Sequence, residues 1–263
     1  MAFIQCNCQS QLLGVGVTFW AIVPEPPFAP GKKRKPAAVR FPVLYLLHGL
    51  SDDHTMWVRK TSIERYALDA GIAVVMPAVN RSFYADMKHG YPYWAFITEE
   101  LPYLAQRMLP VSDRPSHTYV AGLSMGGYGA FKMALTFPQR FAAAASLSGA
   151  LDMAHRTDDA GVDDGLNPDL TLCFGGPECV ENTENDLLML LGRYSKSKGR
   201  KPLLYQWCGT EDFLYGHNTV FRKRAKKLGV RLTYEEGPGG HEWVCWDRQI
   251  QRFIELVTSR KSR

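Results

Sequence analysis

The stretch Tyr119-Val-Ala-Gly-Leu-Ser-Met-Gly-Gly-Tyr-Gly129 joins an apolar, β-favouring run to a Gly-x-Ser-x-Gly pentapeptide and then to a helix-like segment. This order is typical of a nucleophile elbow, in which a serine sits strained at a sharp strand-to-helix turn with its hydroxyl exposed. Gly122 and Gly126 lack the Cβ atoms that would collide as the chain reverses. The stretch therefore predicts Ser124 as a nucleophile, although the pentapeptide alone also fits an ordinary glycine-rich turn.

Length and composition favour one large α/β domain over residues 1–263, because 46% of the 263 residues are hydrophobic and can bury a sizeable core. The net charge is only +5, and the basic residues fall in separate runs at 32–35, 193–201 and 222–227. We interpret these runs as solvated surface and expect no nucleic-acid partner. The chain begins without a basic leader and apolar core and has no apolar run of membrane-spanning length, which predicts a cytoplasmic location without membrane insertion.

The six cysteines are scattered along the chain and are expected to be mostly free thiols. Cys6-x-Cys8 and the pair Cys173 and Cys179 have neither the spacing nor the nearby histidines of a structural zinc site, so no metal is expected. The sequence leaves open whether Cys208 and Cys245 approach each other.

Short apolar runs alternate with helix-compatible segments, which predicts a mostly parallel sheet with helices on both faces. A proline-rich loop at 24–36 follows the first strand. Residues 152–201 carry acidic clusters and turn signals, and we expect them to form an insertion over the carboxyl edge of the sheet. Strands are expected at 12–23, 43–47, 72–76, 118–121, 142–147, 202–207 and 231–234, and helices at 55–69, 99–108, 127–137, 185–194, 219–228 and 243–257.

A nucleophilic serine needs a base to take its proton and a carboxylate to orient that base. In α/β-hydrolases these residues follow in the order Ser, Asp or Glu, His. Asp212 lies directly after the strand expected at 202–207, with Glu211 beside it as the competitor. His241 lies in a glycine loop after the last expected strand. Ser124, Asp212 and His241 are therefore the predicted catalytic residues.

An oxyanion formed during acyl transfer needs fixed backbone donors. One such donor is usually the N–H after the nucleophile, which here belongs to Met125. The other usually comes from the loop after the third strand of the fold. His48-Gly49-Leu50 follows the strand expected at 43–47, which predicts the N–H of Leu50 as the second donor.

Several motifs together resemble the putative-esterase (esterase D) family of α/β-hydrolases, with bacterial tributyrin esterases as the nearest branch. They are Leu-Leu-His-Gly-Leu-Ser-Asp-Asp-His-Thr-Met-Trp at 46–57, Ala-Gly-Leu-Ser-Met-Gly-Gly-Tyr-Gly-Ala at 121–130, Ser-Leu-Ser-Gly-Ala at 146–150 and Gly-Pro-Gly-Gly-His-Glu-Trp at 237–243. The resemblance implies an α/β-hydrolase fold with a short insertion after the sixth strand. It also implies a serine carboxylesterase that needs no cofactor and no metal and acts on small acyl esters, from acetyl to butyryl, with sugar-linked or feruloyl esters as further candidates.

Two questions stay open at this level. Trp57, Tyr84, Trp94 and Trp243 are the candidate walls of a substrate pocket, together with Tyr91 and Tyr93, but core packing explains any one of them equally well. The alternative functions are an S-formylglutathione hydrolase (a thioesterase), an acyltransferase and, more remotely, a hydrolase-like binding protein without catalysis. The expected partner is a small ester substrate, and a homo-oligomer is neither predicted nor excluded.

Overall fold

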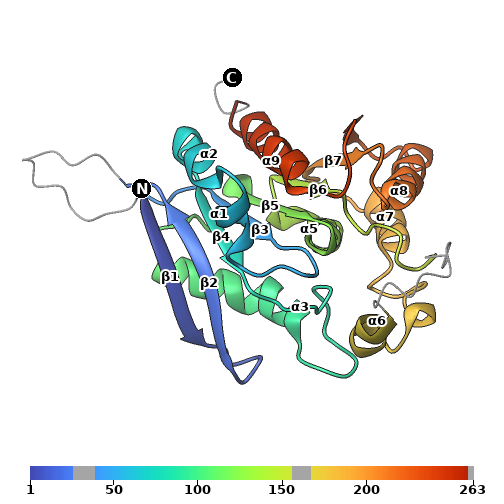
Figure 1. The fold of residues 1–263 in the computed structure, drawn as a ribbon, viewed down its shortest axis with the longest axis horizontal. Coiled ribbons are helices and arrows are strands. Elements are labelled where there is room, and N and C mark those ends of the chain that lie inside the picture. Colours follow the sequence, from blue (N-terminus) through green and yellow to red (C-terminus); the bar gives the residue numbers. More distant parts are fainter. Residues whose placement is uncertain (26–38, 156–166, 260–263) are drawn as a thin grey trace, which may run out of the picture.

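The computed structural model describes residues 1–25, 39–155 and 167–259. Over these residues eight strands form one sheet in the order β1-β2-β4-β3-β5-β6-β7-β8 (Figure 1). β1 pairs antiparallel with β2 and β2 antiparallel with β4, whereas β3 to β8 run parallel, which confirms the predicted mostly parallel sheet. The strands are β1 Ala2–Gln9, β2 Gly16–Val23, β3 Val43–Leu47, β4 Ala73–Pro77, β5 Thr118–Leu123, β6 Ala143–Leu147, β7 Leu203–Gly209 and β8 Leu232–Gly237.

The edge strand β1 was not among the expected elements. Its side chains alternate between half-buried and exposed, and Ile4, Cys6 and Cys8 pack against the core. The first strand expected from the sequence also begins later than predicted, at Gly16, because residues 10–15 form the turn between β1 and β2. Ser10 N–H donates to the Val15 carbonyl at 3.0 Å in this turn.

The helix expected at 55–69 is two helices in the structure. Thr61 is extended, with φ −136° and ψ 170°, and the next N–H, that of Ser62, donates to Asp247 Oδ1 at 2.9 Å. The helices are α1 Met56–Lys60, α2 Ile63–Ala70, α3 Tyr93–Ala95, the π-helical turn η1 Phe96–Glu100, α4 Leu101–Met108, α5 Met125–Thr136, α6 Asn167–Phe174, α7 Leu187–Lys196, α8 Tyr215–Lys227 and α9 Trp243–Thr258, with 3-10 turns η2 Pro115–His117, η3 Pro138–Arg140 and η4 Pro177–Cys179.

Each face of the sheet has its own apolar core. Alternate residues of β3 enter the two cores, with Leu44 and Leu46 on one side and Val43, Tyr45 and Leu47 on the other. Helices α1, α2 and α9 cover the first face (Figure 1), and α4, α5, α7 and α8 pack on the second. The prediction of helices on both faces is therefore confirmed.

The described part of the insertion lies against the loop that follows β4. Arg81 forms an ion pair with Asp169 of α6 at 2.5 Å, and the N–H groups of Lys88 and His89 donate to carbonyls at the end of α6 at 2.9 Å. Asp186 caps α7 by accepting from the N–H groups of two residues in its first turn. The acidic stretch 158–164 and most of the proline-rich loop at 24–36 lie outside the described residues.

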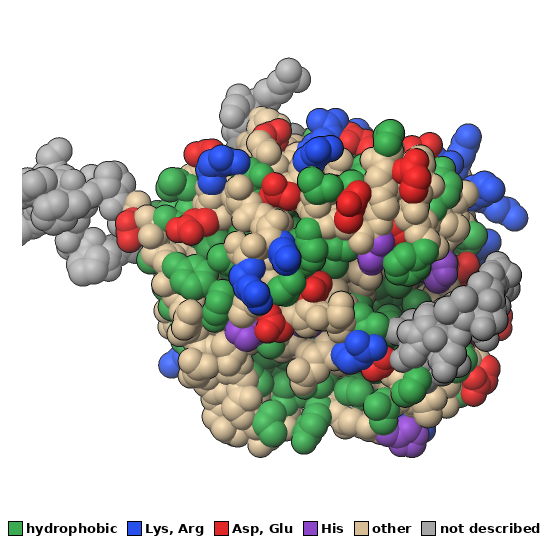
Figure 2. Space-filling model, in the orientation of Figure 1, with side chains coloured by type: hydrophobic (Ala, Val, Ile, Leu, Met, Phe, Trp, Pro, Cys, Tyr) green, Lys and Arg blue, Asp and Glu red, His purple; other side chains and the backbone are tan. Residues whose placement is uncertain are grey.

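The surface shown in Figure 2 carries Lys and Arg interspersed with Asp and Glu. No broad patch of one sign stands out on this face. Of the helices in the described ranges, none is both long enough and apolar enough to cross a membrane.

Candidate active site

Ser124 stands at a strained turn between β5 and α5. Its backbone has φ 52° and ψ −120°, in a region that residues other than glycine seldom adopt. Its N–H donates to the Leu147 carbonyl of β6 at 2.9 Å, and its carbonyl accepts from Tyr128 N–H at 3.0 Å. The side chain is partly exposed. This geometry is that of a nucleophile elbow.

Two glycines permit this turn because neighbouring backbone fills the space around them. A Cβ on Gly122 would overlap the Gly126 carbonyl, and a Cβ on Gly126 would overlap the Leu47 carbonyl and lie 2.7 Å from the His48 oxygen. The start of α5 therefore packs directly on the carboxyl end of β3. This close packing places Met125 beside the loop that contains Leu50.

Asp212 and His241 meet at the same edge of the sheet, in the loops after the neighbouring strands β7 and β8. His241 Nδ1 lies 3.0 Å from Asp212 Oδ1 and 2.9 Å from Oδ2. The carboxylate is fully buried and also accepts from Leu214 N–H at 2.8 Å, whereas the imidazole is 19% exposed. Because a carboxylate only accepts hydrogen bonds, Nδ1 carries the proton and Nε2 is left as the basic nitrogen.

The competitor Glu211 has a different role. It is exposed and accepts hydrogen bonds from the Gly239 N–H and from Thr210 Oγ1, and the bond from Gly239 N–H is the main cause of its lowered pKa. Glu211 therefore fixes the glycine loop that carries His241, while Asp212 contacts the imidazole itself.

Aromatic rings flank the imidazole of His241. The Phe213 ring lies 4.4 Å away between centroids, and the Trp246 ring meets it edge-on at 4.8 Å. Trp246 is held in turn by a 3.1 Å hydrogen bond from its indole N–H to Ser148 Oγ. Phe213 is 75% exposed and was not among the predicted site residues, although its position next to Asp212 could have suggested it.

The loop after β3 is organised around the buried side chain of His48. Its Nε2 accepts from Val79 N–H at 3.1 Å, so Nδ1 carries the proton and donates to the Gly49 carbonyl at 2.7 Å. Burial lowers the pKa of His48 to about 4. Gly49 N–H donates to Asp52 Oδ2 at 3.2 Å. Among the described residues, the backbone hydrogen bonds outside helices and strands give no acceptor to the N–H of Leu50 or to that of Met125. Both groups are therefore suited to donate to an oxyanion.

Two of the six aromatic residues expected in a pocket wall, Trp57 and Tyr84, belong to the core instead. Trp57 and Tyr84 are completely buried, so neither presents surface to a ligand. The Trp57 indole donates to the Leu47 carbonyl at 3.0 Å, and the Tyr84 hydroxyl donates to the His48 carbonyl at 2.9 Å. Both side chains therefore bond to the backbone at the start of residues 48–50, the predicted oxyanion loop.

Trp94 and Trp243 are partly exposed but also packed on aromatic neighbours. Trp94 stacks on Phe137 with 5.9 Å between ring centroids, and Trp243 meets Trp57 and Trp246 edge-on at 5.2 and 5.4 Å. Trp243 lies two residues after His241, and its place in a pocket wall stays a prediction.

Cys208 and Cys245 do not form a disulfide. Both are buried free thiols, and burial raises the pKa of each above its ordinary value. They therefore act as small packing residues, and Cys245 lies so close to Gly239 that a Cβ there would overlap its sulfur.

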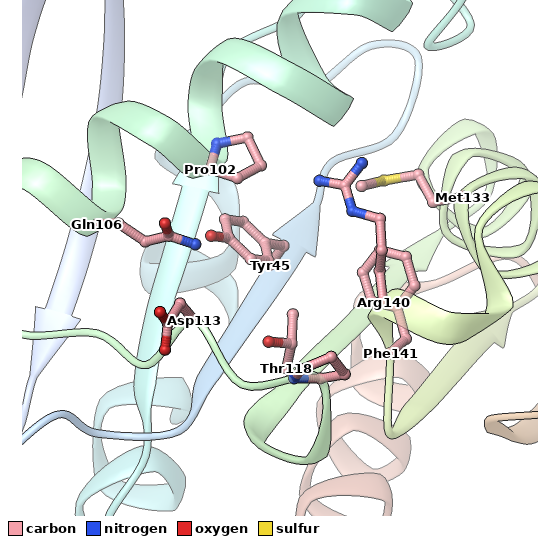
Figure 3. Close-up of a pocket in the computed structure, with 9 residues that line it drawn as sticks. Tyr45, Pro102, Gln106, Asp113, Thr118, Met133, Arg140 and Phe141 are labelled. Carbon is pink, nitrogen blue, oxygen red and sulfur yellow. The ribbon is translucent and has the colours of Figure 1, made fainter. Parts of the chain in front are cut away.

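A small cavity of about 80 Å³ lies at the opposite, amino end of the sheet, where Tyr45 and Arg140 point toward it (Figure 3). Thr118, the first residue of β5, also lines it, whereas Ser124 follows the last residue of β5. A volume of this size holds only two or three water molecules, each of which takes about 30 Å³. The cavity is separate from the candidate active site.

A serine at a strained elbow, a buried carboxylate bonded to a histidine and this order of strands define a serine hydrolase of the α/β-hydrolase fold. Comparison with known proteins agrees with this class. The family model described as putative esterase matches residues 28–254, and the chain belongs to that family. An acetyl esterase of Caldicellulosiruptor saccharolyticus is 30% identical over 267 residues, covering 98% of both chains.

Two solved structures from Staphylococcus aureus are similar over 98% of both chains. The substrate-bound fluorophosphonate-binding serine hydrolase F superposes with a TM-score of 0.87 at 34% identity. An S-formylglutathione hydrolase superposes with a TM-score of 0.85 at 35% identity. Family and relatives together show that this protein is a serine hydrolase of the carboxylesterase type.

Proposed function

We propose that this enzyme hydrolyses short-chain acyl esters, from acetyl to butyryl, through an acyl-enzyme on Ser124. The observation that carries the proposal is the hydrogen bond of His241 Nδ1 to both oxygens of Asp212, at the sheet edge where Ser124 stands on its strained turn. The similarity to an acetyl esterase over 98% of the chain supports the small acyl group.

In the first half-reaction, His241 Nε2 takes the proton of the Ser124 hydroxyl while its oxygen attacks the ester carbonyl carbon. The tetrahedral oxyanion accepts from the N–H groups of Leu50 and Met125. Met125 is the first residue of α5, so the positive end of the helix dipole also faces the oxyanion. The carbon–oxygen bond to the alcohol then breaks, and the protonated imidazole gives its proton to the leaving oxygen.

In the second half-reaction, His241 takes a proton from water, whose oxygen attacks the acyl-enzyme. A second tetrahedral oxyanion forms at the same donors, and as it collapses the bond between the acyl carbon and Ser124 Oγ breaks, the protonated imidazole returns its proton to Oγ, and the acid is released. Asp212 stays ionised throughout, because its task is to stabilise the imidazolium and hold the tautomer with Nδ1 protonated.

Thioester hydrolysis is the second candidate, favoured by the similarity to an S-formylglutathione hydrolase. The same two steps would release a thiol in place of an alcohol, so the residues assigned above serve both reactions. The ratio of kcat/KM for S-formylglutathione to that for p-nitrophenyl acetate decides between the two substrates. Partition of the acyl group between water and added methanol measures transfer.

The proposal is tested with Ser124→Ala, with Ser116→Ala as the matched control, because Ser116 is exposed in η2 at the amino end of β5. We expect Ser124→Ala to lose turnover of p-nitrophenyl acetate and butyrate and Ser116→Ala to keep it. A fluorophosphonate should label Ser124, as read by peptide mass spectrometry. Full turnover by Ser124→Ala, or labelling at another serine, would reject the assignment.

A further inference from the structure

Lys132 of α5 is a lysine that the reaction described above leaves unused. It lies about two helical turns after Ser124 and is 2% exposed. Lysine is almost never fully buried unless its charge is paired. In the part of the chain that the structure describes, no carboxylate forms an ion pair with it. The groups that accept hydrogen bonds from its ammonium are neutral.

Two hydrogen-bond acceptors and two aromatic rings surround this ammonium, and the more distant ring is that of Tyr128, at 6.0 Å from its centroid. Nζ donates to Asn185 Oδ1 at 2.7 Å and to the Tyr84 carbonyl at 3.2 Å, and the Trp94 ring covers it at 4.3 Å from the ring centroid. Burial lowers the pKa of Lys132 to about 7, and the carboxylates of Asp86 and Glu184 offset only part of this effect. Because burying a lysine is costly, we expect its contacts to hold neighbouring groups in place.

The contact with Tyr84 adds to two local hydrogen bonds of its segment, in which Tyr84 N–H donates to Ser82 Oγ at 3.2 Å and Ala85 N–H donates to the Ser82 carbonyl at 3.0 Å. Phe83 and Tyr84 have φ values of 49° and 50°, in the left-handed region that aromatic residues avoid. The Tyr84 ring lies against Gly129, where a Cβ would come within 2.6 Å of a ring carbon. One turn of α5 thus holds Tyr84 twice, through its ring at Gly129 and through its carbonyl at Lys132.

Tyr84 passes this constraint to the oxyanion loop. Its hydroxyl donates to the His48 carbonyl at 2.9 Å, and that carbonyl belongs to the peptide unit directly before the one that carries the N–H of Leu50. The N–H of Met125 belongs to the first residue of α5. Both proposed oxyanion donors are therefore fixed to the same helix, one directly and the other through Lys132, Tyr84 and His48.

We propose that Lys132 is a positioning residue, which sets the spacing of the two oxyanion donors by holding Tyr84 against the His48 peptide. This role rests on the proposed acyl-transfer function. It also explains the buried position of Tyr84 and the partly buried position of Trp94, because both side chains enclose the ammonium or transmit its constraint. Asn185, at the end of the insertion, fixes the ammonium from the other side.

The test uses two conservative changes. Lys132→Met keeps most of the side-chain volume but removes the donors, and Tyr84→Phe removes only the hydroxyl. Since a misplacement of about 1 Å can cost a hundredfold in rate, we expect each change to lower kcat for p-nitrophenyl butyrate by about tenfold or more, with KM within about twofold. Affinity for a trifluoromethyl ketone, which forms an oxyanion on Ser124, should fall by the same factor as kcat.

The double variant shows whether the two residues act in one path. If Lys132 acts through Tyr84, the fold loss of kcat in the double variant should be no greater than that of the single variant with the larger loss. Independent effects would instead multiply. Lys223→Met and Tyr103→Phe are the matched controls, because both residues are exposed on helices away from the elbow, and both variants should keep wild-type kcat. Thermal melts report whether each variant is folded.

Wild-type kcat in folded Lys132→Met, or multiplying losses in the double variant, would overturn the proposal. If Lys132→Met does not fold, wild-type kcat in Tyr84→Phe alone overturns it. These outcomes differ from failure of the esterase assignment, in which Ser124→Ala keeps its turnover. Wild-type kcat in Lys132→Met with intact fluorophosphonate labelling of Ser124 rejects only the role of Lys132.

Discussion

The imidazole of His241 and the carboxylate of Asp212 are joined by contacts from one nitrogen to both oxygens, at 3.0 and 2.9 Å. The two residues lie in separate loops, after the adjacent parallel strands β7 and β8. This hydrogen bond from one ring nitrogen to a carboxylate fixes both the orientation of the imidazole and the nitrogen that carries its proton. The pair therefore leaves Nε2 as the unprotonated nitrogen of the ring, as the proposed mechanism requires.

Asp212→Asn should lower kcat by about 10³ to 10⁴-fold while KM changes little, because an amide can donate to Nδ1 and favour the wrong tautomer. Glu211→Gln is the comparison, since that side chain bonds to the Gly239 N–H instead of the imidazole. We expect it to lose less than tenfold. Steady-state kinetics with p-nitrophenyl acetate measures both variants, and equal losses would contradict the assignment of Asp212.

Gly126→Ala should lower the free energy of unfolding by about 2 kcal/mol or more, because the new Cβ would overlap the Leu47 carbonyl. Gly192→Ala is the control, because this glycine lies within α7 with open space around its Cβ position. There the same change should stabilise the protein by about 0.5–1 kcal/mol. Urea unfolding measures both, and a stable Gly126→Ala would contradict the close packing of α5 on β3.

Much of the sheet could be predicted from the sequence, because strands buried on both faces are continuous apolar runs. Val43–Leu47 is of this kind, and it ends where the polar His48 follows. The predicted triad residues follow the same logic, since loops after parallel strands meet at one edge. β1 was missed because its alternating pattern uses Cys, Gln and Asn in place of β-branched residues.

Tertiary contacts decided what local sequence could not. The break between α1 and α2 coincides with a hydrogen bond from Ser62 N–H to Asp247, a residue of α9. Trp57 and Tyr84 were candidate pocket residues because aromatic residues near a site suit either a ligand or the core. Their complete burial depends on which way the backbone turns each side chain, and no spacing rule gives that for a loop or a short helix.

Phe213→Ala should raise KM for butyrate and aryl esters several-fold, while the free energy of unfolding changes by less than about 0.5 kcal/mol. The reason is that Phe213 is 75% exposed and its ring lies 4.4 Å from that of His241. An exposed apolar ring beside the base is suited to contact the apolar part of a substrate. Unchanged KM across a series from acetate to octanoate would contradict this role.

Trp57→Phe should have the opposite effect and lower stability without changing KM. The smaller ring leaves a cavity and removes the donor to the Leu47 carbonyl, so the free energy of unfolding should fall by about 1–3 kcal/mol. Chemical denaturation combined with the same ester series separates the two variants. A raised KM in Trp57→Phe at unchanged stability would show that Trp57 lines the substrate pocket.

Acid should destabilise the fold through His48, whose pKa falls from an ordinary value of 6.5 to about 4 on burial. Between these two values the unfolded chain binds a proton that the folded chain does not, so stability falls as the pH decreases. With about 1.4 kcal/mol for each pH unit, the loss from this group approaches about 3 kcal/mol at pH 4. His48→Gln removes the group, and exposed His89→Gln is the control. The difference in unfolding free energy between wild type and His48→Gln should therefore change between pH 6.5 and 4 and stay constant above pH 7. A difference that does not depend on pH would show that the fold does not hold the His48 ring neutral.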